Sequence, residues 1–147
     1  MRALPFSFLL ISTQATYAGE ICAPGQDRYI HIGAQTFAVS VADSSLKRQR
    51  GLSGLRELST QTGMWFEFER PEVHGFWMQA MNFPIDLIWI SSGYQVLGAI
   101  TLQPCTDTCP IYLSPGAVRH VLEVNAGEFA GKVGDRVTWS CSAQRRK

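Results

Sequence analysis

Short apolar segments, each closed by turn-forming residues, recur along the chain from residue 29 onward. The clearest is 37–41, in which Phe37, Val39 and Val41 alternate with small residues. A period of two is typical of a half-buried β-strand. Further strands are predicted at 29–32, 63–68, 74–78, 85–90, 96–102, 118–124 and 136–141. We therefore predict a mainly β (β-rich α+β) fold, with a compact, mostly antiparallel, small barrel-like sheet and one or two short helices. The two helical pieces are expected at 46–50, before Gly51, and at 126–130.

The first 18 residues have the features of a secretory signal peptide. Arg2 precedes a mostly apolar run from Leu4 to Ile11, and Thr16-Tyr17-Ala18 gives a small-residue cleavage pattern ahead of Gly19. A membrane-spanning helix needs about 20 apolar residues, and the polar residues at 12–14 end this run much earlier. We expect an exported protein, periplasmic or extracellular, whose mature chain is a single β-rich domain at 19–147 without a membrane span.

Four cysteines in an exported chain favour disulfide bonds. They allow three pairings, and the sequence leaves all three open. We favour Cys105 with Cys109, which flank a three-residue loop, and Cys22 with Cys141, which would join the two ends of the mature domain. Zinc binding and a thiol redox role are weaker alternatives, because both more often use a C-x-x-C pair.

Charge excludes one class of partner. The chain has 13 basic and 12 acidic residues, and its one basic cluster is the tail 145–147. A nucleic-acid binder normally carries a basic patch or stripe, so we expect no nucleic-acid partner.

The segment 74–90 is the candidate ligand site, because aromatic and sulfur side chains are densest there. Trp77 and Met78 offer apolar contact, while Asp86 with Arg50 would orient a polar group of the ligand. The loop 104–115 would cover this pocket. For Asp86 we give more weight to a structural role, in which it accepts hydrogen bonds from the loop 82–84 or pairs with an arginine, than to a general-base role.

These residues support three hypotheses, of which a non-catalytic domain that binds a small molecule or an envelope component comes first. The second is a hydrolase or isomerase that uses Asp86 and His74. The third is cuprous-copper handling by His74, Met78 and Met81, since thioether and imidazole ligands suit that ion, although methionines more often fill gaps in a core.

No recognisable catalytic constellation, resident metal site or cofactor motif supports an enzyme assignment. Glu123 could pair with His120 in the segment 118–124 only if the strand bends. We expect Glu123 to be solvated instead.

The chain resembles an uncharacterised bacterial and archaeal family, the domain of unknown function 192. The resemblance spans roughly 38–137 and is carried by these motifs in order: Gly51-Leu52, Gly63-Met64-Trp65-Phe66, Phe76-Trp77-Met78, Pro84-Ile85-Asp86, Pro104-Cys105, Cys109-Pro110, Tyr112, Val121-Leu122-Glu123, Gly127 and Gly134-Asp135. Many members have Asn-Thr where this chain has Ala80 and Met81. The resemblance implies a small β-rich domain, often exported, and implies no activity.

Overall fold

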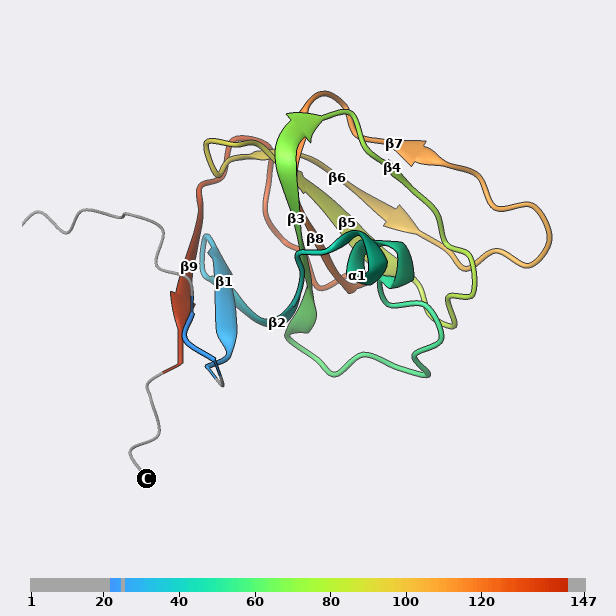
Figure 1. Ribbon diagram of the computed structural model, residues 1–147, viewed down its shortest axis with the longest axis horizontal. Coiled ribbons are helices and arrows are strands. Elements are labelled where there is room, and N and C mark those ends of the chain that lie inside the picture. Colours follow the sequence, from blue (N-terminus) through green and yellow to red (C-terminus); the bar gives the residue numbers. More distant parts are fainter. Residues whose placement is uncertain (1–21, 25, 143–147) are drawn as a thin grey trace, which may run out of the picture.

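The computed structural model describes residues 22–24 and 26–142, which form nine strands and one helix (Figure 1). The predicted signal peptide and the basic tail lie outside these residues. The elements are β1 (Arg28–Ile32), β2 (Gln35–Ala42), α1 (Ser45–Arg50), β3 (Thr62–Glu72), β4 (Gly75–Phe76), β5 (Ile85–Ile90), β6 (Val96–Leu102), β7 (Tyr112–Leu113), β8 (Val118–Asn125) and β9 (Val137–Cys141).

Seven strands form one mixed sheet in the order β6-β5-β8-β3-β2-β1-β9. Within it β2 and β3 are parallel, and the other neighbouring strands are antiparallel. The two edges of the sheet approach each other at a single bridge between Gln95 and Arg136, where the Val96 amide donates to the Asp135 carbonyl at 3.0 Å. The predicted β-rich, mostly antiparallel fold is confirmed, and within the described residues the sheet curls like a barrel without closing into one.

The sheet buries an apolar core on each of its faces. The helix-side core lies under α1 and contains Phe66, Leu87 and Val121. The opposite core, which we call the barrel-side core, contains Trp65, Ile88 and Leu122. All six residues of β5 are buried, because this strand lies between β6 and β8 and contributes alternate side chains to both cores.

The short helix α1 has a cap at each end. The Ser44 side chain accepts from the Lys47 amide, and the Gly51 amide donates to the Lys47 carbonyl at 2.9 Å. Gly51 has φ of +51°, a conformation that a residue without Cβ adopts at low cost. The second predicted helical piece, 126–130, is instead a turn in which the Glu128 amide donates to the Asn125 carbonyl. No helix in residues 22–24 and 26–142 has the length and apolar character needed to cross a membrane.

The predicted strand at 74–78 differs from the observed one. Only Gly75 and Phe76 are extended, and they pair with β7 in a separate two-stranded ribbon rather than with β3. Both neighbour positions of β3 are already taken, by β2 and β8. Backbone and side-chain hydrogen bonds between His74 and Ser114 at 2.9 and 3.1 Å hold this segment to the 104–115 loop instead.

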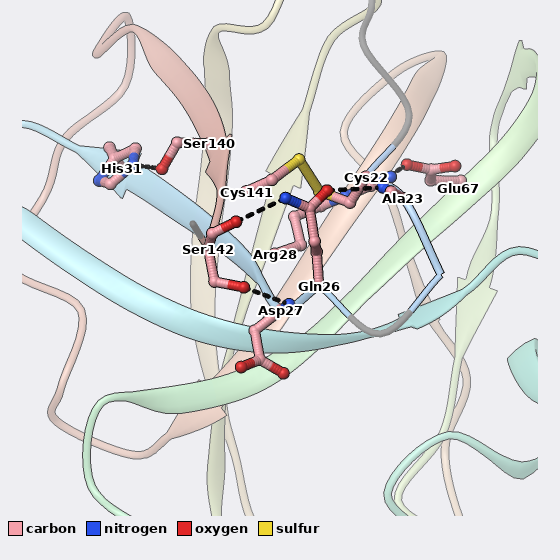
Figure 2. The surroundings of a disulfide bond; sticks show 10 residues. All are labelled: Cys22, Ala23, Gln26, Asp27, Arg28, His31, Glu67, Ser140, Cys141 and Ser142. Atoms are coloured by element: carbon pink, nitrogen blue, oxygen red, sulfur yellow. Dashed lines mark hydrogen bonds and ion pairs between the residues drawn. A yellow bond between two sulfur atoms is a disulfide. The ribbon is translucent and has the colours of Figure 1, made fainter. Parts of the chain in front are cut away.

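The cysteine pairing that we favoured is the one in the structure. Cys22 pairs with Cys141 and Cys105 with Cys109, with Cα–Cα distances of 5.5 and 5.4 Å. Figure 2 shows that the first pair ties the N-terminal segment to β9, next to hydrogen bonds from Gln26 and Asp27 to Ser142. The described cysteines are therefore all paired, none being a free thiol.

Candidate functional site

A pocket of about 190 Å³ opens on the helix-side face of the sheet, beside α1 and the β3–β4 segment. We call it the aromatic pocket. Sites for drug-sized ligands are usually about 300–1,000 Å³, so this one suits a small molecule or one end of a larger molecule. Its lining residues are Arg48, Gln49, Arg50, Gly51, Leu52, Ser53, Phe66, Phe68, His74, Gly75, Phe76, Trp77, Met78, Met81, Ile85 and Glu123.

Four aromatic side chains from β3, β4 and the segment after β4 form its walls. Phe76 contacts Phe66 and Phe68 edge to face, with ring centroids 5.6 and 6.3 Å apart. The His74 ring stacks on Phe68 at a centroid distance of 3.6 Å. Trp77 is 44% exposed. Because the other rings are packed against one another, Trp77 is the aromatic side chain most available to an incoming ligand.

Glu123, from the central strand β8, adds a buried carboxyl group to this apolar surface. Its side chain shares the helix-side face with Val121, and a Cβ placed on Gly51 would lie 3.9 Å from its Oε2 atom. The residue is 7% exposed. Burial raises the pKa of Glu123 to about 8. The expectation of a solvated Glu123 is therefore wrong. Glu123 and His120 are three positions apart on β8, so their side chains project from opposite faces of the sheet and do not pair.

No group in the described part of the chain donates a hydrogen bond to the Glu123 carboxyl, and burial is the one cause of its raised pKa. Buried polar groups in proteins are nearly always hydrogen-bonded. At neutral pH this carboxyl group therefore holds a proton and projects into a pocket without a protein partner.

Two arginines line the pocket from α1. Arg48 is half-buried; it donates to the Glu67 carbonyl at 2.9 Å, and its guanidinium lies 5.3 Å from the centre of the Phe68 ring. Arg50, which the sequence singled out, is exposed. The pocket therefore combines a cationic side, aromatic walls and one acid.

His74, Met78 and Met81 all line the aromatic pocket, as the copper hypothesis requires. The Nε2 atom of His74 is buried and has no hydrogen-bond partner in the described residues. Burial, above all, lowers the pKa of His74, so the ring is neutral at pH 7. No cluster of three or more His, Cys, Asp or Glu suited to a metal was found in residues 22–24 and 26–142.

Asp86 does not line this pocket. It alternates with Leu87 on β5 and projects toward the barrel-side face, where its carboxyl accepts from Thr101 Oγ1 at 2.6 Å and from the Gly127 and Phe129 amides at 2.8 and 3.1 Å. This is the structural role to which we gave more weight, although the donors are not the 82–84 loop or an arginine. Asp86 therefore cannot join Arg50 on a ligand or act with His74 as a catalytic pair.

A second cavity, of about 290 Å³, lies at one end of the barrel-side core and was not predicted. The imidazole of His120 is stacked between Trp65 and Tyr94, at centroid distances of 5.0 and 4.8 Å. Both of its ring nitrogens lack hydrogen-bond partners in the described residues. Burial lowers the pKa of His120 to about 4. At neutral pH this imidazole is therefore uncharged and packs as an aromatic ring between Trp65 and Tyr94.

Sequence reasoning thus placed four of its five candidate ligand contacts, Arg50, His74, Trp77 and Met78, around one pocket. It missed Glu123 and Arg48, and none of the residues 104–115 lines the pocket that this loop was expected to cover. A signal for Glu123 was present, because a lone acid within the apolar run 121–124 predicts a carboxyl in a strand buried on both faces.

The fold and the pocket define a small β-rich domain with a candidate ligand site. Residues 28–139 match the family model DUF192, described as Uncharacterized ACR. The chain therefore belongs to the domain of unknown function 192 family, as the sequence motifs indicated.

Two crystal structures have the same fold. One is a Sinorhizobium meliloti 1021 protein provisionally described as a transcription regulator, with 26% identity and a TM-score of 0.71 over 82% of this chain and 98% of that one. The other is a Novosphingobium aromaticivorans DSM 12444 protein of unknown function, with 25% identity and a TM-score of 0.69 over 84% and 94%. The comparison with curated proteins gave no match.

Proposed function

We propose that this chain is an exported, non-catalytic binding domain that holds a small molecule or part of an envelope component in the aromatic pocket. The observation that carries the proposal is the unpartnered carboxyl of Glu123 in that pocket. A ligand that donates to this carboxyl would supply a hydrogen bond that the described residues do not provide.

Export is supported by the cysteines and by the first 18 residues. Two disulfide-bonded pairs are typical of proteins that fold in an oxidising compartment. The signal-peptide pattern of residues 1–18 and the mature domain at 19–147 remain predictions. Fractionating cells that express the full chain, followed by N-terminal sequencing of the product, tests both, and an uncleaved cytoplasmic protein would contradict them.

Binding is tested by native mass spectrometry of the protein purified from the periplasm of its producing cells. We expect an added small-molecule mass that is lost or reduced in Trp77→Ala, because the exposed indole forms part of the pocket wall. Val133→Ala is the matched control, since Val133 is 67% exposed and does not line the pocket. A retained mass of equal occupancy in both variants would contradict this location of the site.

Cuprous copper is a second candidate occupant, because His74, Met78 and Met81 line the same pocket and His74 Nε2 has no described partner. Anaerobic titration with a cuprous chelator complex provides the test. If the ion binds there, Met78→Leu should weaken binding at least about tenfold while preserving core volume. Equal affinity in both proteins would end this alternative.

A further inference from the structure

The Glu123 carboxyl in the aromatic pocket can accept hydrogen bonds, and no group in the described residues donates one to it. The other ionisable side chains that line the pocket are Arg48, Arg50 and His74. Arg48 is engaged by the Glu67 carbonyl and the Phe68 ring. None of the three forms an ion pair or hydrogen bond with Glu123 in the described residues, and burial raises the pKa of the Glu123 carboxyl. The Glu123 carboxyl is thus electrostatically uncompensated within its own pocket.

The walls around this acid favour positive charge. The face of an aromatic ring attracts a cation, by about 0.5–2 kcal/mol depending on desolvation. Phe66, Phe76 and Trp77 line the pocket together with Glu123, and Phe66 lies close to the acid, because one Cβ on Gly51 would be 3.5 Å from Phe66 Cζ and 3.9 Å from Glu123 Oε2. A buried carboxyl group beside several aromatic rings is a chemical environment suited to an ammonium group.

We infer that the aromatic pocket binds its ligand through a protonated amine, whose N–H groups donate to Glu123 and whose charge lies against the aromatic walls. This inference rests on the proposed binding function and adds the chemical class of the ligand. The small volume admits a compact amine or the amino end of a larger envelope molecule. Arg48 and Arg50 line the same pocket from α1, where an anionic group elsewhere on the same molecule would be favoured.

Two other ligand classes predict different behaviour. A neutral molecule with a carbonyl or hydroxyl oxygen would accept a hydrogen bond from protonated Glu123. An anion would bind to the arginines and avoid the acid. The three classes are separated by benzylamine, benzyl alcohol and benzoate, which share one ring and differ in the group that reaches Glu123.

Affinities of the three probes are measured by calorimetry, with the mature protein in its disulfide-bonded form. We expect benzylamine to bind at least about tenfold more tightly than benzyl alcohol at pH 8, because a charge-assisted hydrogen bond and the ring faces act only on the ammonium. Glu123→Gln should remove that difference. Equal affinities of amine and alcohol in the wild type, or tighter binding of benzoate, would overturn the amine inference and leave the binding function standing.

The pH dependence gives a readout that needs no variant. Below pH 8 an ammonium ligand must displace the proton of Glu123, so benzylamine affinity should rise by up to about tenfold per pH unit from pH 6.5 to 8. The other ionisable groups that line the pocket are Arg48, Arg50 and His74, and burial lowers the pKa of His74 from its usual 6.5. Benzyl alcohol affinity should stay level or fall. A benzylamine profile without this rise would contradict the inference, whereas no binding of any probe would contradict the proposed function itself.

Discussion

Asp86 and Glu123 are two buried acids on adjacent strands of one sheet, 5% and 7% exposed, and they project from opposite faces. Asp86 accepts three hydrogen bonds, from the Thr101 hydroxyl and the Gly127 and Phe129 amides. Glu123 accepts none from the described residues, and its pKa rises to about 8. Similar burial therefore has opposite consequences. One acid holds the sheet to the loop after β8, and the other is available to a ligand.

The largest expected contrast is in stability. Asp86→Ala removes three hydrogen bonds and leaves two amides and a hydroxyl unpaired, so the free energy of unfolding should fall by about 3 kcal/mol. At pH 6 the Glu123 carboxyl is protonated in the folded chain and ionised in the unfolded one, so Glu123→Gln, which keeps the shape and cannot ionise, should instead raise it by about 2 kcal/mol. Urea unfolding monitored by circular dichroism measures both, and equal losses would remove the distinction between the two acids.

The second contrast is a pH dependence that belongs to Glu123. Its pKa is about 8 in the folded state and near the usual 4.5 when unfolded, so the unfolded chain holds fewer protons between these values. The free energy of unfolding should therefore fall as pH rises from 4.5 to 8, by about 1.4 kcal/mol per pH unit.

The wild-type profile minus that of Glu123→Gln isolates this effect. The subtraction is needed because His120 has the opposite effect. Its pKa is lowered to about 4, so the free energy of unfolding decreases as the pH is lowered from 6.5 to 4. Parallel profiles for the two proteins would mean that the Glu123 carboxyl is satisfied in solution.

The smallest expected change in stability is at the mouth of the pocket. Trp77→Ala should alter the free energy of unfolding by less than about 1 kcal/mol, because the indole is 44% exposed. The same change should weaken benzylamine about tenfold by removing a ring face. Thermal unfolding with and without benzylamine reports both quantities. A large loss of stability would show that Trp77 supports the core rather than the ligand.

Sequence patterns predicted the strands of this domain better than the directions of its side chains. The run 85–90 was correctly predicted as a buried strand, yet every position except Asp86 is apolar. When both faces of a strand are buried, polar and apolar residues do not alternate, so the sequence does not show which side chains project from which face. A shift of one residue exchanges the two faces. The same ambiguity concealed Glu123 on β8. Identifying which acid faced the pocket required the register of three adjacent strands.

Long-range pairing accounts for the other differences. The local pattern could not show that β4 contains only Gly75 and Phe76. Its position depends on hydrogen bonds between His74 and Ser114, which lie forty residues apart in the sequence. The parallel pairing of β2 with β3 likewise depends on the whole sheet order. By contrast, the end of α1 at Gly51 and the strands β1 and β2 depend on neighbouring residues, and they were predicted correctly.

The bond between Cys22 and Cys141 has a consequence for biosynthesis. Its partners are separated by 119 positions, whereas Cys105 and Cys109 are separated by four. A thiol that emerges early from the ribosome or translocon must stay unreacted until nearly the entire polypeptide has followed. Rapid closure of the three-residue loop between Cys105 and Cys109 would leave neither thiol free to pair wrongly with Cys22 before Cys141 emerges, so the order of oxidation would favour the observed pairing.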